Sequence, residues 1–314
     1  MVIKNLRFTK RCILLSIILL LLGILRQGLA DPESPKPARF MLGYYSPSIT
    51  EIASRSDIEV SMNFWAKELI SQSGQEIGIN ITEGGAILFD TMDQLSNAVD
   101  RGDIDMVVAP PIQLVRYFKR DDLQDGFIGV LSNKRPENIL VISRRDKNIT
   151  SINDLKGKQF LLPVNDEFAE IYLDSLFLEN FHKPVREIAR SIENENKANR
   201  IVLDIYFNKG DVGVVYLSTF EVMSELNPDI AQKLSIVAQY PIKSRNFGFF
   251  LRNYPLAKKI MDLAISTVNR KNQRAKQILE VFKTEELDIC KVQYLDAYDK
   301  FYQRYQALKK KYQP

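Results

Sequence analysis

The chain has 314 residues, of which 45% are hydrophobic and 26% charged, and its formal net charge is +4. A hydrophobic share of this size excludes an intrinsically disordered protein. His182 is the single histidine, and Cys12 lies in an N-terminal segment that we expect to be removed, so a zinc site built from histidine and cysteine is excluded. We therefore expect a globular protein with no metal and no other cofactor.

The first thirty residues have the pattern of a signal peptide. Basic residues between Lys4 and Arg11 precede an apolar run from Cys12 to Leu25, and Gly28-Leu29-Ala30 offers small residues for cleavage. The run covers 14 residues, whereas a helix needs about 20 to span a bilayer. Cleavage and a periplasmic location are therefore favoured over a membrane-anchored form. Residues 1–30 hold five of the 43 basic residues and no acidic ones, which leaves 38 basic against 39 acidic residues. No basic excess remains that would suggest nucleic acid as a partner.

Strand and helix patterns alternate through the first half of the mature chain. Strands are predicted over 39–45, 77–82, 104–109, 127–131 and 139–143, and helices over 58–72, 91–100 and 112–118. Gly84-Gly85 is expected to break the chain. Pro111 suits the first turn of its helix, where no backbone donor is needed.

The same alternation continues in the second half. Strands are predicted over 159–162, 212–217, 234–238 and 247–251, and helices over 167–180, 193–207, 218–225, 255–269, 272–282 and 294–312. Asn165 or Asp166 is the expected N-cap of one helix and Ser218 or Thr219 of another. An aromatic stripe on the last helix, which includes Tyr298, is expected to pack on the body of the protein, with docking to a membrane partner as the alternative.

The alternation predicts an α/β protein with parallel sheets flanked by helices. In such sheets, ligands bind beyond the carboxyl ends of the strands. Candidate binding residues are therefore those that follow the strands.

Four segments stand out by their order and spacing. They are Gly43-Tyr44-Tyr45-Ser46-Pro47 with Phe64-Trp65-Ala66-Lys67-Glu68-Leu69, then Gly102-Asp103-Ile104-Asp105-Met106-Val107-Val108-Ala109-Pro110-Pro111, then Ser151-Ile152-Asn153-Asp154-Leu155-Lys156-Gly157-Lys158, and Gly210-Asp211-Val212-Gly213-Val214-Val215-Tyr216. With these segments the chain resembles the periplasmic binding proteins of phosphate, phosphite and phosphonate uptake, which have the type 2 periplasmic-binding fold. The likeness covers most of residues 39–282.

The resemblance implies two lobes, each a mainly parallel sheet flanked by helices, with a helical C-terminal extension. Lobe one would comprise residues 39–140 and 246–314, and lobe two residues 141–245, after a signal peptide over 1–30 and a flexible lead over 31–38. Crossings near 138–144 and 244–251 would form a hinge, and hinge closure around ligand is the usual motion of this architecture. The implied function is a solute-binding protein that closes over a small ligand and delivers it to an ABC-type importer.

The chain departs from the family at the start of the helix after the Asp-Leu-Lys-Gly segment. A Ser-Thr-Ser-Gly pattern is usual there, and it would hold an anion at the positive helix end. Here the sequence reads Pro163-Val164-Asn165-Asp166-Glu167-Phe168. Because two acids compete with a bound anion, a cation, an amine-bearing solute or a neutral polar solute is the more compatible ligand. The alternative is that both acids act only as a helix cap.

Residues that follow the predicted strands are the candidates for ligand binding. They are Tyr44, Tyr45, Ser46, Pro110, Pro111, Gln113, Asn165, Asp166, Glu167, Tyr216, Ser218 and Arg245. Aromatic walls with a few polar groups suit a small-molecule pocket, and Arg245 could hold an acid group through two hydrogen bonds. Several of these residues also have a structural alternative. The first is packing of one of the tyrosines in the core, the second is termination of a strand by the prolines, and the third is exposure of Arg245 on the surface.

Three functions compete at this stage. The first is the importer component, a monomer whose partners are a small-molecule ligand and a membrane permease. The second is a sensory binding protein that signals to a membrane kinase or cyclase, or a degenerate binding lobe used for protein interaction. The third is an enzyme on the same fold, which would need a nucleophile or a paired acid and base in the cleft. The sequence offers neither, so we expect no catalytic residues.

Overall fold

The structure is a computed structural model, and it describes residues 37–48, 54–70, 74–75, 78–130, 136–269, 273, 277, 279–280 and 284–313. The expected signal peptide and most of the helix predicted over 272–282 lie outside these residues. Within the described ranges, no helix is long and apolar enough to cross a membrane.

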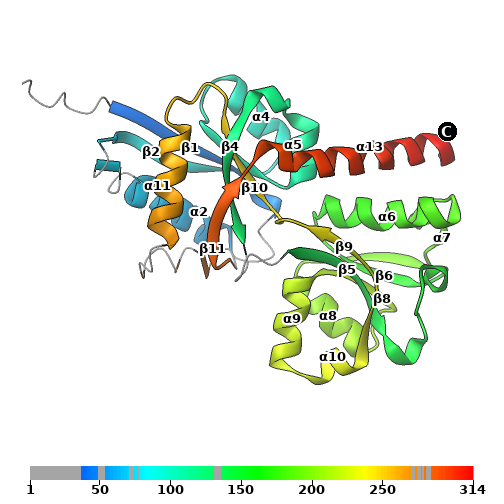
Figure 1. The fold of residues 1–314 in the computed structure, drawn as a ribbon. Helices are drawn as coiled ribbons and strands as arrows, with labels where there is room; N and C mark the ends of the chain where they lie inside the picture. The colour runs from blue at the N-terminus through cyan, green and yellow to red at the C-terminus, as the bar shows by residue number, and fades with distance from the viewer. Residues whose placement is uncertain are drawn as a thin grey trace, which may run out of the picture.

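Within the described residues, eleven strands form two separate sheets (Figure 1). The first sheet has the order β11-β4-β10-β3-β1-β2, built from β1 Pro37–Tyr45, β2 Asn80–Phe89, β3 Met106–Ala109, β4 Leu123–Val130, β10 Phe247–Leu251 and β11 Glu286–Cys290. The second has the order β7-β6-β8-β5-β9, built from β5 Glu137–Arg144, β6 Gln159–Pro163, β7 Ser191–Glu195, β8 Val212–Tyr216 and β9 Leu234–Ile242. We use lobe one and lobe two for the parts of the chain around the first and the second sheet.

Most strands of each sheet point the same way. Strands β1, β2 and β3 pair in parallel, as do β6, β7 and β8, whereas β5, β10 and β11 pair antiparallel with their neighbours. Strands β5 and β10 are the first ones after each crossing of the chain between the sheets. The predicted α/β class with mainly parallel sheets is confirmed. All of β5 pairs within the second sheet, so residues 137–140, which the sequence placed in lobe one, lie with lobe two.

Helices cover both faces of each sheet (Figure 1). They are α2 Arg55–Asn63, continued by a π-helical segment Phe64–Leu69, then α4 Met92–Asp100, α5 Pro111–Tyr117, α6 Glu167–Phe181, α7 Val185–Ile188, α8 Ala198–Tyr206, α9 Leu217–Leu226, α10 Asp229–Lys233, α11 Ala257–Asn269 and α13 Leu295–Tyr312. Short 3-10 turns cover Ser46–Ser48, Arg120–Asp122, Arg145–Lys147, Ile152–Leu155 and Val292–Tyr294. Pro111 begins α5, as predicted.

The largest cluster of buried apolar side chains among the described residues extends through both lobes. It joins buried residues of α4 and α5 in lobe one to those of β6 and α6 in lobe two, and Tyr298 and Tyr305 of α13 belong to it. The C-terminal helix α13 lies along α6 (Figure 1). The prediction that its aromatic stripe packs on the body of the protein is confirmed, since Tyr298 and Tyr305 are buried.

Three local predictions were wrong. Gly84 and Gly85 do not break the chain but lie inside β2. Glycine at position 84 serves close packing instead, since a Cβ there would lie 3.0 Å from the backbone oxygen of Ala66 in the helix Phe64–Leu69. Ser191–Glu195 forms the parallel edge strand β7 instead of the start of a helix, and its polar side chains suit an edge that faces water.

The predicted cap of α9 was the third error. Tyr216 is the N-cap residue and makes no side-chain cap hydrogen bond, while Ser218 lies inside the helix. The backbone N–H of Ser218 donates instead to the carboxylate of Glu137, at 3.1 Å. The buried carboxylate of Glu137 on β5 therefore accepts from a backbone N–H group in the first turn of α9, a role that we had predicted for the hydroxyl of Ser218 or Thr219.

Candidate functional site

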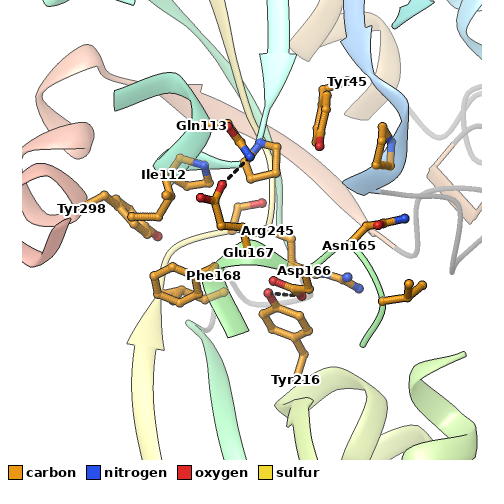
Figure 2. Close-up of a pocket in the computed structure, with 16 residues that line it drawn as sticks. Tyr45, Ile112, Gln113, Asn165, Asp166, Glu167, Phe168, Tyr216, Arg245 and Tyr298 are labelled. Atoms are coloured by element: carbon orange, nitrogen blue, oxygen red, sulfur yellow. Dashed lines mark hydrogen bonds between the residues drawn. The ribbon is translucent and has the colours of Figure 1, made fainter. Parts of the chain in front are cut away.

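The two lobes meet where α5 faces the first turn of α6 (Figure 2). Glu167 begins α6, and its carboxylate accepts hydrogen bonds from Arg116 and Gln113 of α5. Arg116 and Glu167 also form an ion pair, with each side chain about one third exposed. Lobe one therefore supplies the donors and lobe two the acceptor of a polar contact across the junction.

Asp166 holds the start of α6 in place. One of its carboxylate oxygens accepts from the backbone N–H of Ala169 at 3.0 Å, which makes Asp166 the N-cap, one of the two residues that the sequence predicted for this role. The other accepts from the hydroxyl of Tyr216 at 2.7 Å, drawn as a dashed line in Figure 2. Burial raises the pKa of Asp166, and the hydrogen bonds from Tyr216 and the helix backbone oppose this rise. Both oxygens of Asp166 are thus engaged within the protein.

Arg245 lies at the second crossing between the lobes. Its guanidinium carbon is 4.2 Å from the ring centre of Tyr216, a cation–π distance. Burial lowers the pKa of Arg245 to about 10, so the side chain stays protonated at neutral pH. Although it lies deep in the protein, part of its surface opens to the junction. Arg245 is half-buried, and a positive charge that faces a cavity in this way is suited to an anionic ligand group.

Most of the predicted residues gather around a small cavity at this junction. Its volume is about 30 Å³, and its lining includes Tyr45, Pro110, Pro111, Gln113, Asn165, Asp166, Glu167, Tyr216 and Arg245. Asn165 reaches it with a φ of 57°, a left-handed conformation that asparagine tolerates. The space suffices for about two water molecules, because the side chains of the junction fill most of it.

A second and much larger cavity opens between the lobes on the other face of the first sheet. Its volume is about 820 Å³, within the range of ligand pockets. Lobe one contributes an apolar wall that includes Met62, Trp65 and Phe127, and lobe two contributes one face of α9 with Val222 and Leu226. These two α9 side chains are 54% and 76% exposed. Arg245 lines this cavity as well, so its charge lies where the two cavities meet.

The predicted residues are divided between these two cavities. Successive residues of a strand point to opposite faces, so Tyr44 lines the large cavity and Tyr45 the small one. Ser218 also lines the large cavity. Ser46 lies outside both cavities. Its buried hydroxyl is within hydrogen-bond distance of two acceptors, Phe89 O at 3.1 Å and the carboxylate of Asp90 at 3.0 Å.

Sequence reasoning missed several residues of the site. Arg116 follows Gln113 by three positions, so the two share one face of a helix. This spacing could have identified Arg116 as a site residue once Gln113 was a candidate. Trp65 and Met62 lie in the segment 58–72, which was predicted to be a helix, and neither was named as a site residue. Periodicity alone does not distinguish a core wall from the wall of a cavity.

Two α/β lobes with cavities between them define a protein that binds a solute between its lobes. Residues 75–288 match the family described as ABC transporter, phosphonate, periplasmic substrate-binding protein. The chain belongs to this family, and it is therefore an extracytoplasmic solute-binding protein of ABC-type import. Membership gives no support to the sensory or protein-interaction alternatives.

Solved structures show the same fold. A Xanthomonas citri protein bound to ATP has a TM-score of 0.60 at 15% identity and covers 87% of this chain and 98% of its own. A binding-protein component of an ABC phosphonate transporter from Pseudomonas aeruginosa has a TM-score of 0.58 at 14% identity, with 87% and 88% covered. A Prochlorococcus marinus protein in complex with methylphosphonate has a TM-score of 0.57 at 10% identity, with 85% and 98% covered. No curated protein matches the sequence significantly.

Proposed function

We propose that the chain binds an organic phosphonate with an apolar substituent, and that the large cavity is its binding site. The acid group contacts Arg245, and the substituent lies between Trp65 of lobe one and Val222 and Leu226 of lobe two. We also propose that the chain acts as two lobes that close over this ligand, with the boundaries predicted from the sequence, 39–140 with 246–314 and 141–245, shifted so that all of β5, from residue 137, belongs to lobe two.

The observation that carries the proposal is the position of Arg245. Its protonated guanidinium lies at the meeting point of the two cavities, and arginine can hold phosphonate oxygens through two parallel hydrogen bonds. The walls beside it are largely apolar, which favours a ligand that carries hydrocarbon as well as charge. The phosphonate ligand of the family supports the same chemistry.

Asp166 and Glu167 were expected to favour a cation or an amine. Both carboxylates already accept hydrogen bonds from the protein, Asp166 from Tyr216 and Glu167 from Arg116, which weakens that argument. An amine-bearing solute is nevertheless the second candidate, because Glu221 and Glu225 of α9 line the large cavity. A zwitterion would then place its amine toward α9 and its acid group toward Arg245.

Calorimetric titration with a homologous series tests the site. The wild-type protein is titrated with methyl-, butyl- and hexylphosphonate, and with an aminoalkylphosphonate of matched length. Affinity should increase along the alkyl series, by about 0.8 kcal/mol for each buried methylene at most. An aminoalkylphosphonate that binds better than its alkyl counterpart would favour the second candidate.

Two arginines that flank β10 provide a matched pair of variants. Arg245→Gln should abolish binding of every phosphonate, whereas Arg252→Gln, which removes the same charge beyond the other end of β10, should leave binding unchanged. Equal affinity of Arg245→Gln and wild type would contradict the proposed site.

Export, oligomeric state, the membrane partner and the fate of the ligand belong to the same proposal. The chain is exported to the periplasm with cleavage after residue 30, acts as a monomer, passes its ligand to a membrane permease and releases it chemically unchanged. N-terminal sequencing of the exported protein tests the cleavage, and mass analysis of the released ligand tests the absence of turnover.

A further inference from the structure

The junction between α5 and α6 has the donor groups of an oxyanion-binding site, and the carboxylate of Glu167 occupies it. Arg116 and Gln113 lie three residues apart on α5 and point the same way, and both donate to Glu167 of the opposite lobe. A guanidinium beside an amide N–H₂ is a donor set that suits a planar or tetrahedral oxyanion. The protein supplies that oxyanion itself, as a side-chain carboxylate.

The remaining space agrees with this arrangement. About 30 Å³ is left in the small cavity, enough for about two water molecules and too little for sulfate or phosphate. The side chain of Asp166 lies beside Glu167 in the same wall and occupies further space there. A small inorganic anion thus meets both a steric and an electrostatic barrier here.

Further contacts fix the two sides of the junction. The Arg116 guanidinium carbon lies 5.8 Å from the ring centre of Tyr302 on α13, which limits its freedom on the lobe-one side. On the lobe-two side, Asp166 anchors the first turn of α6 to Tyr216. Glu167 therefore meets Arg116 between two supported helices.

We propose that Glu167 is a built-in anion, which links the lobes at the small cavity and excludes small inorganic anions from it. The exclusion follows from this junction alone. With the small cavity closed to anions, an anionic ligand can reach Arg245 only from the large cavity. The resulting selectivity for organic over inorganic anions rests on the function proposed above.

Glu167→Ala tests the proposal, with sulfate and inorganic phosphate as probes. Removal of the carboxylate vacates space next to Arg116 and Gln113, so sulfate affinity measured by calorimetry should increase on the order of tenfold or more. The gain should vanish in the double variant Glu167→Ala with Arg116→Ala. Glu170→Ala removes one negative charge a turn further along α6 without opening the junction, and it should bind sulfate no better than wild type.

Circular dichroism verifies that each variant is folded, and Glu167→Ser carries the test if the alanine variant is not. A folded Glu167→Ala or Glu167→Ser protein without a gain in sulfate affinity would overturn the proposal. An equal gain in Glu170→Ala would also overturn it, since general charge removal would then be the cause. The alkylphosphonate series on the wild type is a separate measurement, so a failure of the proposed ligand leaves this result interpretable.

Discussion

The hydroxyl of Tyr298 accepts a hydrogen bond of 3.0 Å from the backbone N–H of Lys243. Tyr298 belongs to the C-terminal helix, and Lys243 belongs to the segment by which the chain returns from lobe two to lobe one. The same ring packs against Phe168 of α6 and Phe247 of β10, with ring centres 6.0 and 5.4 Å apart. One side chain of α13 thus touches both lobes and the crossing between them.

Loss of this contact should destabilise the whole protein. Tyr298→Phe leaves the Lys243 N–H without its acceptor, at a cost of about 1–3 kcal/mol. Tyr298→Ala also leaves a cavity among aromatic rings, for a total of about 3–5 kcal/mol. Urea unfolding measures both. Tyr312→Ala, which removes a ring stacked on His182 near the end of the same helix, serves as the control, and an equal loss there would contradict a special role for Tyr298.

Asp166 should make stability depend on pH. Burial raises its pKa from the unfolded value of 3.8, so the carboxylate is less favourable in the folded protein than in the unfolded chain. Its contribution to stability is fully present below 3.8 and is lost as the pH rises through the folded pKa. Asp166→Asn keeps a capping oxygen and lacks this titration.

Urea unfolding of wild type and Asp166→Asn between about pH 3 and pH 7 measures this difference. The variant should gain stability relative to wild type as the pH increases over this range. If the difference in unfolding free energy between the two proteins does not change with pH, burial does not raise the pKa of Asp166 and the prediction is contradicted.

Strands β4 and β10 approach each other too closely for a side chain at Gly126. A Cβ there would lie 2.2 Å from the carbonyl oxygen of Gly248, a backbone atom that cannot turn aside. Gly126→Ala should cost about 3 kcal/mol or more, at the upper end of overpacking effects. Gly85→Ala in β2 is the control, because its Cβ would meet its nearest atom at 3.3 Å. Thermal unfolding should separate the two variants clearly.

The large cavity makes a prediction about ligand length. Val222→Asp places a charge on the apolar face of α9, so it should weaken hexylphosphonate binding by about tenfold or more and leave methylphosphonate almost unaffected. Competition between the two phosphonates measures this ratio. An equal loss for both would place the substituent elsewhere.

Much of this architecture follows from sequence patterns. The alternation of apolar runs and amphipathic stretches predicted parallel sheets flanked by helices, and the family resemblance implied two lobes. Asp166 was one of two N-cap candidates because both precede an apolar helix. The strand Ser191–Glu195 was missed because its polar residues carry no period of two and gain their order by pairing with β6.

The site was predicted less completely than the fold. The contact between Arg116 and Glu167 joins residues 51 positions apart in the sequence, so it depends on how the lobes meet. The assignment of Tyr44 and Tyr45 to different cavities follows from strand geometry, but both cavities had first to be located. Residues after strands could be named as candidates, whereas the division of roles among them required the three-dimensional structure.

Trp65 provides the most direct test of ligand binding in the large cavity. It is the single tryptophan of the chain, it is buried, and its side chain lines this cavity. Its fluorescence is recorded while hexylphosphonate is added to the wild-type protein and to Arg245→Gln. The account predicts a saturable change in wild type, with the midpoint found by calorimetry, and no change in Arg245→Gln. Binding by calorimetry without any change at Trp65, or the same change in both proteins, would contradict it.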